Sequence, residues 1–173
     1  MLYHLSVNPE KQDILRKECR SVESITIKDL DKLKYLKACL LEALRLTPLL
    51  PIHSRVISED MIVAGYHIPK DTLVLWSNNM LGMDASRFPE SEKFLPERWL
   101  EHKKSIHPFA VRPFGHGPRM CIGKRFAELE IYIAIHRLMT NFHVNWMSVQ
   151  PLTMSQKLLN TPDQRLDFQF NDL

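Results

Sequence analysis

The sequence predicts an α+β fold that is mainly helical and forms one unit over residues 1–173. Apolar residues recur every three or four positions between Leu30 and Leu44 and again between Phe126 and Leu138, which indicates two long helices. Short β-type runs between Leu50 and Leu75 indicate small antiparallel sheets. A content of 11 prolines against 5 glycines favours extended pieces and irregular coil between the helices. With 45% hydrophobic residues, the chain has enough apolar material to bury a core.

The N-terminal region predicts two helices in succession. Met1–Leu5 has the texture of the last turns of a helix, and we expect the chain to begin inside that element. Asn8 is a favourable N-cap for the next helix, and Pro9 suits its first position. We expect this helix to place Ile14 on its apolar face and to end near Ser21.

The middle of the chain changes from helical to extended texture after the leucine-rich helix, which is expected to end before Pro48. The β-type runs Val56–Ile57, Met61–Val63 and Leu73–Leu75 are separated by turn residues and predict a small antiparallel sheet. A short helix is expected over Asn78–Met83.

The C-terminal half begins with a long irregular segment. From Phe88 to Pro113 the sequence lacks periodicity and holds four prolines, which predicts an ordered meander. A Gly- and Pro-rich loop over Phe114–Cys121 leads into a long helix from about Gly123 to Asn141. Alternating apolar and polar residues over Phe142–Trp146 and Leu166–Phe170 predict edge strands.

Charge and cysteine content exclude several classes of function. Lys and Arg number 23 against 20 Asp and Glu, and the net charge of +3 is too small to indicate a nucleic-acid partner. The three cysteines are odd in number and far apart, so they predict neither a disulfide framework nor paired zinc ligands. Residues 1–7 lack the features of a secretory signal, and no run of about 18 apolar residues predicts a membrane-spanning helix.

The loop from Phe114 to Gly123 carries the most informative chemistry of the sequence. Cys121 stands alone where a Gly-rich loop turns into a helix, and free amide groups with the positive helix end favour a thiolate there. Gly117 permits a backbone conformation that other residues resist, and Gly123 leaves room for a flat ligand beside the sulfur. Arg119 supplies a cation for a carboxylate. Together these features describe a haem site with a cysteine ligand.

The pattern Phe-x-x-Gly-x-Arg-x-Cys-x-Gly in this loop resembles the haem-binding signature of the cytochrome P-450 family. Glu42 and Arg45 match the family's Glu-x-x-Arg motif, and Arg98 matches its Pro-x-Arg element. In the family these three residues form a buried triad, and breaking such a network costs about 3–5 kcal/mol. The order of elements matches as well. The resemblance therefore implies the C-terminal portion of the cytochrome P-450 fold, with small antiparallel sheets, a meander and a Cys-ligand loop leading into a long helix.

The resemblance also implies a cofactor and its contacts. Haem b (iron protoporphyrin IX) would be held through the thiolate of Cys121, and its propionates would meet Arg119 and Arg55. Phe114 would pack near the sulfur. The substrate is expected to be lipophilic and steroid-like. The residues expected to face it are Leu50, Ile52, His53, Leu158 and Leu159.

Within the family, the residues around Leu36–Cys39 and Arg98–Leu100 look most like the mitochondrial class. That class takes electrons from an acidic ferredoxin, which a basic face would steer. A second lysine that the class often carries one turn after Lys37 is replaced here by Leu41. The residues expected to dock the ferredoxin are Lys34, Lys37, Lys124 and Arg125. By this resemblance we expect a location on the matrix side of the mitochondrial inner membrane, with peripheral membrane association through segments outside this chain.

The resemblance leaves the activity of this chain open between two expectations. The family's oxygen-activating helix carries an acid–Thr pair, whereas the one Asp-Thr pair here, Asp71–Thr72, follows Pro69 in a predicted turn. We therefore expect that helix and the N-terminal part to lie outside the chain. The first expectation is a monooxygenase in the full-length parent, and the alternative is a truncated, non-catalytic product that binds haem weakly or not at all.

Two readings from other classes compete with haem binding. A zinc site could use His107, His116 and Cys121, but the spacing matches no common zinc motif. A hydrolase with a cysteine nucleophile would need a positioned base, which the loop does not supply. Haem absorbance without zinc uptake separates the haem reading from both.

Overall fold

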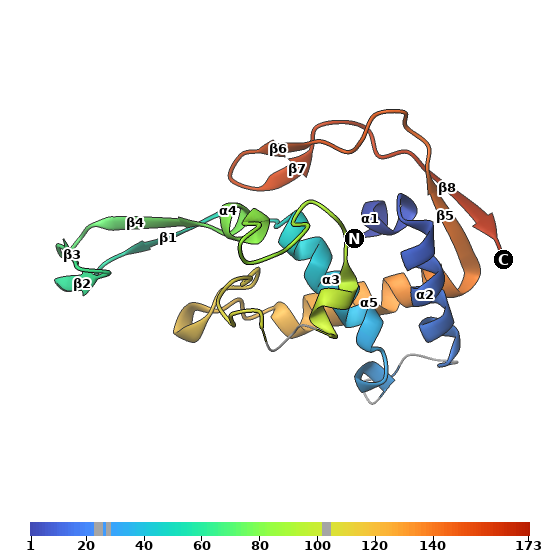
Figure 1. The fold of residues 1–173 in the computed structure, drawn as a ribbon, viewed down its shortest axis with the longest axis horizontal. Helices are drawn as coiled ribbons and strands as arrows, with labels where there is room; N and C mark the ends of the chain where they lie inside the picture. The colour runs from blue at the N-terminus through green and yellow to red at the C-terminus, as the bar shows by residue number, and fades with distance from the viewer. Residues whose placement is uncertain (23–25, 27–28, 102–104) are drawn as a thin grey trace.

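A computed structural model of the chain describes residues 1–22, 26, 29–101 and 105–173. The helices gather into one body, and a narrow β-ribbon projects from it to one side (Figure 1). Within the described part of the chain, no helix is both long enough and apolar enough to cross a bilayer. The α-helices are α1 (Leu2–Ser6), α2 (Pro9–Arg20), α3 (Lys34–Leu46), α4 (Asn78–Met83) and α5 (Lys124–Asn141). Short 3₁₀ turns are η1 (Asp29–Asp31), η2 (Pro96–Trp99) and η3 (Gly117–Arg119).

Helix α2 begins and ends where the sequence predicts. Asn8 occupies the N-cap position and Pro9 the first turn, but the Asn8 side chain donates backwards to the His4 carbonyl at 2.7 Å. The expectation for Ile14 is wrong, because its side chain is 42% exposed. The buried side of α2 carries Gln12 instead, which is fully buried. A polar residue can occupy that side because it hydrogen bonds with two other elements.

Helix α3 is shorter at its start than the leucine periodicity predicts. Leu30 lies in η1, and the helix begins at Lys34 and ends one residue before Thr47, ahead of Pro48. Its inner face buries Leu36, Cys39, Leu40 and Ala43 at an exposure of 3% or less. The predicted end before proline is confirmed.

The ribbon consists of two nested antiparallel pairs, and the expected sheet is confirmed. Strand β1 (Ile52–Val56) pairs with β4 (Leu73–Ser77), and β2 (Met61–Val63) pairs with β3 (Tyr66–Ile68) at the tip. Ala64 and Gly65 both have positive φ angles, of 51° and 84°, as a two-residue hairpin turn requires. Strand β3 was not predicted, and β1 begins four residues before the predicted run Val56–Ile57.

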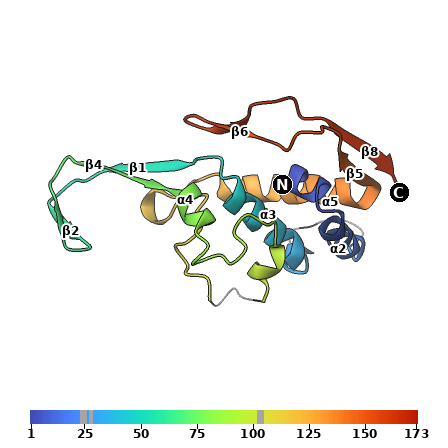
Figure 2. The same cartoon turned by 45° about the horizontal axis from the view of Figure 1, so that its top comes forward.

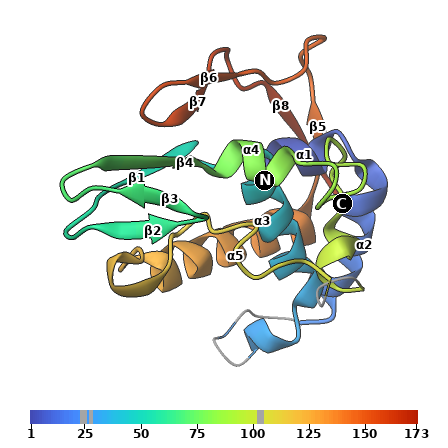
Figure 3. The same cartoon turned by 60° about the vertical axis from the view of Figure 1, so that its left-hand side comes forward.

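The C-terminal strands run along one side of the helical body (Figures 2 and 3). Helix α5 continues directly into β5 (Phe142–Trp146), which pairs with β8 (Phe168–Asp172). The predicted strand β5 is confirmed, and β8 lies two residues later than predicted. A second hairpin, β6 (Met154–Gln156) with β7 (Asn160–Pro162), was not predicted.

The core lies between α1, α2, α3, α5 and strand β5. Each fully buried Leu side chain contributes about 1.5–3 kcal/mol relative to an exposed one. Of the residues that indicated α5, Phe126 is 67% exposed, whereas Leu138 packs against the core. The buried apolar cluster includes Leu5, Leu15, Cys19, Leu33, Leu36, Cys39, Leu40, Ala43, Phe94, Tyr132, Ile135, Met139 and Val144.

Candidate functional site

Cys121 lies between η3 and the first turn of α5, in a loop that folds back on itself. Its backbone N–H donates to the Phe114 carbonyl at 2.9 Å, and the Met120 N–H donates to the Gly117 carbonyl at 3.0 Å. These bonds hold the two ends of the loop together without using the Cys121 side chain. The cysteine is exposed, whereas Cys19 and Cys39 are buried in the core.

Glycines give this loop its shape. Gly115 and Gly117 both have a φ angle of +74°, a conformation that residues with a side chain rarely adopt. Gly123 plays a different role, because its φ angle of −83° is ordinary. A Cβ atom at Gly123 would lie 3.9 Å from Sγ of Cys121, in van der Waals contact with the sulfur. The absence of a side chain there keeps that side of the sulfur open.

Exposed apolar side chains flank Cys121 in the sequence and continue on the first turn of α5. Ile122 is fully exposed, Phe126 is 67% exposed, and Met120 is 48% exposed. Large exposed apolar side chains that cluster in one place mark a binding surface. The arrangement suits a large, flat and apolar ligand that lies beside the sulfur.

Arg119 directly precedes these apolar residues in the sequence, and Lys124 lies between Ile122 and Phe126. Arg119 is exposed and makes no hydrogen bond or ion pair with the residues that the structure describes. Arg55 on β1 is also exposed, and its Nη1 donates only to the Ser54 carbonyl, at 3.1 Å. Lys124 lies with its Nζ 5.9 Å from the centroid of the Phe114 ring and 3.9 Å from Oε1 of Glu128. Both arginines are therefore available to an anionic ligand.

Strand β1 separates two residues that were both expected to face a substrate. Successive side chains of a strand point to opposite faces, so Ile52 and His53 diverge, and His53 shares a face with Arg55. The His53 ring stacks on Trp76 of β4, with centroids 5.6 Å apart and planes inclined by 24°. Its Nε2 is buried without a partner. Burial, and then the charge of Arg55, lower the pKa of His53 below its ordinary 6.5.

The β6–β7 hairpin brings Leu158 and Leu159 towards the segment that contains Leu50. Asn160 makes the link, because its Nδ2 donates to the Pro48 carbonyl at 2.6 Å and its N–H donates to the Leu49 carbonyl at 2.8 Å. Leu158 and Leu159 are exposed at the turn, and Leu50 is half-buried. The structure thus brings three of the residues expected to face a substrate into one region.

The structure brings Glu42, Arg45 and Arg98 together in a buried network. Arg45 donates from Nε and Nη2 to the Glu42 carboxylate at 2.9 and 2.8 Å, and Arg98 donates from Nε at 3.0 Å. The backbone N–H of Leu95 and the indole of Trp99 complete the contacts, at 3.0 and 2.8 Å. Sequence reasoning missed Trp99, although it directly follows the Pro-x-Arg element.

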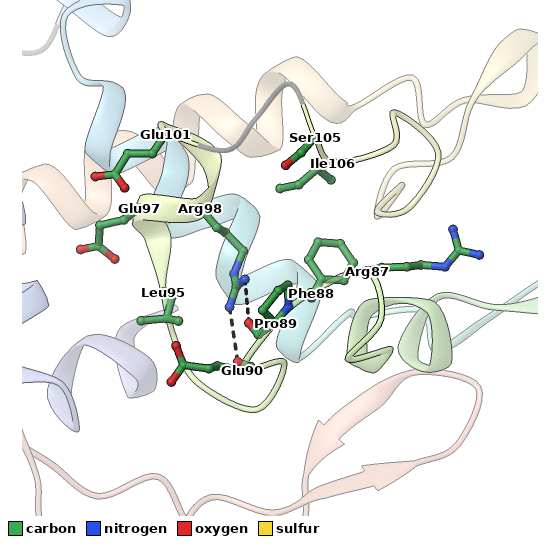
Figure 4. A pocket seen from close by; sticks show the side chains of 10 residues that line it. All are labelled: Arg87, Phe88, Pro89, Glu90, Leu95, Glu97, Arg98, Glu101, Ser105 and Ile106. Atoms are coloured by element: carbon green, nitrogen blue, oxygen red, sulfur yellow. Dashed lines mark hydrogen bonds between the residues drawn. The ribbon is translucent and has the colours of Figure 1, made fainter.

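The two arginines of this network also hold the meander. Arg45 donates from Nη1 to the carbonyls of Gly82 and Ser91 at 2.7 and 2.6 Å. Arg98 donates to the carbonyls of Pro89 and Glu90 at 3.1 and 3.3 Å, as the dashed lines in Figure 4 show. Side-chain donors replace the backbone partners that irregular coil lacks. The network therefore fixes the coil that leads to the Cys121 loop.

A cavity of about 390 Å³ lies beside this meander, under η2 (Figure 4). Oε1 of Glu97 accepts bonds at 3.0 Å from Lys11 and 2.8 Å from Tyr35. Burial raises the pKa of Glu97, but hydrogen bonds from its own backbone, Lys11 and Tyr35 outweigh it and lower the pKa overall. No lining residue belongs to the Cys121 loop. The lining residues are Arg87, Phe88, Pro89, Glu90, Leu95, Glu97, Arg98, Glu101, Ser105 and Ile106.

The lysines expected to dock a ferredoxin differ in their surroundings. Lys37 pairs with Asp31 of η1 at 3.1 Å, so part of its charge is neutralised within the chain. Lys34 and Arg125 are exposed.

Among the described residues, no group of three His, Cys, Asp or Glu side chains is arranged to hold a metal ion, so His107, His116 and Cys121 are not brought together for zinc.

The sequence profile of the family described as Cytochrome P450 matches residues 1–170. The chain belongs to the cytochrome P450 family. It is 37% identical over 98% of its length to the mitochondrial 1,25-dihydroxyvitamin D(3) 24-hydroxylase of Mus musculus, of which it covers 34%. It is 38% identical over 99% of its length to the mitochondrial 25-hydroxyvitamin D-1 alpha hydroxylase of Homo sapiens, of which it covers 35%.

A third relative comes from an insect. The chain is 36% identical over its whole length to the probable cytochrome P450 12c1, mitochondrial, of Drosophila melanogaster, of which it covers 36%. The chain thus spans about a third of the length of these curated relatives. The mainly helical α+β fold with small antiparallel sheets is that of part of a cytochrome P450 domain.

Membership of the cytochrome P450 family implies haem held by a cysteine thiolate, and the residues present fit such a group. The Cys121 loop offers a thiol that no side chain at Gly123 crowds. It also presents exposed apolar surface at Ile122 and Phe126 and, at Arg119, a guanidinium that pairs with no residue the structure describes. The thiol, the apolar surface and the cation match the iron, the ring and the carboxylates of haem, respectively.

Proposed function

We propose that this chain forms the cysteine side of the haem site of a cytochrome P450 monooxygenase. The observation that carries the proposal is the exposed Cys121 at the start of α5, in a loop that matches the family pattern. Residues 1–173 form one portion of the domain, the C-terminal one, and the oxygen-activating helix belongs to the remainder. The full-length parent hydroxylates its substrate with dioxygen and two electrons.

Each residue of the site has a defined task in this proposal. Sγ of Cys121 would hold the haem iron, and the loop bonds to Phe114 and Gly117 keep Cys121 at the helix start. Arg119 and Arg55 would bind the haem carboxylates, and the exposed side chains of Ile122 and Phe126 would pack against the ring. When bound, haem b supplies the activation of dioxygen, which electron donation from the thiolate favours. The network around Glu42 keeps the meander, and therefore the loop, in place.

The substrate is lipophilic and steroid-like. Two relatives are named as hydroxylases of vitamin D compounds, which are of this kind. The apolar side chains of Leu50, Leu158 and Leu159 lie in one region and offer surface for such a molecule. Ile52, on the other face of β1 from His53, adds a further exposed apolar side chain.

The electron donor is an acidic ferredoxin, and the location is the matrix side of the mitochondrial inner membrane. Relatives from mouse, human and fly are named as mitochondrial, which supports this location. Lys34, Lys37, Lys124 and Arg125 provide the positive charge that steers an acidic partner. Peripheral membrane association would use segments outside this chain.

A second candidate is a non-catalytic product that binds haem weakly or not at all. Its support is the complete exposure of Ile122 and the large exposure of Phe126, which leave one side of the site open to water in this chain. Water access weakens the electrostatic and apolar contacts on which cofactor affinity depends. The two candidates differ in whether the chain alone retains haem with a thiolate ligand.

The deciding experiment adds haem to the purified chain, reduces it, adds carbon monoxide and records the absorption spectrum. The proposal expects a strongly red-shifted Soret band that disappears in Cys121→Ala and persists in Cys39→Ala, which removes a buried thiol instead. A band typical of histidine ligation, or a thiolate band that survives Cys121→Ala, contradicts the assignment of the ligand. Weak haem uptake or none by the folded chain supports the second candidate.

A further inference from the structure

Strand β1 presents His53 and Arg55 on the same face, two residues apart. Their partners across the ladder are Trp76 and Val74 of β4, so the four side chains form one patch on the ribbon. The rise of about 3.3 Å per residue places the two side-chain origins about 6.6 Å apart. A carboxylate has two oxygens, so side chains at this separation can approach it together.

The His53 ring is held in place, but its nitrogens have no hydrogen-bond partner among the described residues. Trp76 stacks on it at 5.6 Å between centroids and limits its motion. Neither ring nitrogen hydrogen bonds with another residue of the described chain, and Nε2 is buried. A buried polar atom without a partner costs free energy, and such atoms in native proteins usually have a protein, water or ligand partner. The broad χ2 torsion of histidine lets the ring turn within its stack.

The charge state of the ring suits a hydrogen bond rather than an ion pair. Burial and the nearby Arg55 charge lower the pKa of His53, so the imidazole is neutral near pH 7 and carries one N–H donor. Arg55 keeps its donors towards solvent except for the one that bonds Ser54. One cation and one neutral donor on a single face form a receptor for one carboxylate.

We propose that His53 donates a hydrogen bond to the same haem carboxylate that Arg55 binds. This inference rests on the proposed haem site at Cys121. It assigns His53 to the cofactor and not to the substrate. The apolar side chains of Ile52 and Leu75, both more than half exposed, lie on the opposite face of the ribbon. His53 is then a cofactor-binding residue that Trp76 orients.

The test measures the affinity of the full 173-residue chain for haem by absorbance titration. Two probes are used: iron protoporphyrin IX and its dimethyl ester, in which both carboxylates are blocked. His53→Phe keeps an aromatic ring against Trp76 but removes the donor, and His53→Gln keeps a donor. We expect His53→Phe to weaken binding of the free acid about tenfold, the scale of a lost hydrogen bond to a charged group. His53→Gln should stay within about twofold of the unchanged chain.

The ester separates a carboxylate contact from a packing effect. In the unchanged chain the ester should bind more weakly than the free acid, and His53→Phe should bind the ester as the unchanged chain does. An equal loss with both probes, or no loss with the free acid, overturns the inference. Failure of the Cys121-dependent thiolate band is a different result, because it contradicts the proposed haem site itself. Circular dichroism of each apo variant confirms that it is folded.

Discussion

The indole N–H of Trp99 donates a hydrogen bond to Oε2 of Glu42 at 2.8 Å. This bond joins the 3₁₀ turn η2 to the centre of α3, across more than fifty residues of sequence. With it, each oxygen of the buried carboxylate accepts bonds from more than one donor, because Arg45 reaches both oxygens. The carboxylate is therefore the point at which the meander is fixed to the helical body.

Trp99→Phe should destabilise the chain by about 1–3 kcal/mol, since it removes one donor to a buried charge and keeps most of the ring packing. Urea unfolding followed by circular dichroism measures this change. Trp76→Phe is the matched control, because the Trp76 indole makes no hydrogen bond with the described residues and its stack on His53 survives. Equal midpoints for both variants would show that the Trp99 bond contributes nothing.

Glu42→Gln should cost more, about 3–5 kcal/mol, because it leaves Arg45 and Arg98 as buried cations without a counter-charge. The amide also turns one acceptor into a donor that faces other donors. The expected observation is a low yield of folded protein and a large fall in the unfolding midpoint. Glu130→Gln, on the exposed side of α5, removes the same charge and should leave the midpoint unchanged.

Part of this network could be predicted from the sequence, because two of its residues have a recognisable local spacing and a third belongs to a short motif. Glu42 and Arg45 are one helical turn apart, and Arg98 belongs to a short motif, so the pattern is visible without the fold. Trp99 contributes through its position in space, which no spacing rule reveals. The Cys121 loop was predicted for the same reason: glycines, an arginine and a cysteine lie within ten consecutive residues.

Long-range polar contacts account for the main error. Gln12 was not predicted to be buried, yet its Oε1 accepts from the Val144 N–H at 2.8 Å and its Nε2 donates to the Val144 carbonyl at 2.9 Å. Gln12 thus pairs with strand β5 as another strand would, and the apolar Ile14 is left facing solvent. Periodicity assumes that apolar residues mark the buried face, and a buried amide with partners 132 residues away violates that assumption.

The stability of the chain should fall as the pH is lowered from about 6.5, because of His4. Burial, then the terminal amino group and Arg45, lower the pKa of His4 from 6.5 to about 3. Between these values the unfolded chain binds a proton that the folded chain does not, so this contribution to stability is complete above pH 6.5 and declines towards pH 3. The slope approaches about 1.4 kcal/mol per pH unit.

His4→Phe tests this dependence, since a phenyl ring can keep the stack on Phe94 without titrating. The difference between the unfolding free energies at about pH 7 and about pH 5 should be smaller in the variant than in the unchanged chain, by about 2 kcal/mol. His116→Gln alters an exposed histidine and should retain the original difference. A variant with the full original difference would remove His4 as the cause.

Asp31 should compete with an acidic ferredoxin for Lys37, because the two side chains already form an ion pair at 3.1 Å. Lys37→Gln should weaken ferredoxin binding, whereas Asp31→Asn should strengthen it about threefold, which is within the range of an exposed ion pair. Surface plasmon resonance at low ionic strength measures both effects, and added salt should reduce them. Asp172→Asn is the control for net charge alone, because it removes an exposed carboxylate that has no ion partner in the described chain.

The double variant decides whether the pair itself is responsible. If Asp31 acts by holding Lys37, then Asp31→Asn should have no more effect in the Lys37→Gln background than Asp172→Asn does. If it acts only through the overall field, its effect should be the same in both backgrounds, since long-range charge effects add. An unchanged affinity in Lys37→Gln would instead move the docking surface away from α3, towards Lys124 and Arg125 at the start of α5. The ion pair on η1 would then have no bearing on the choice of partner.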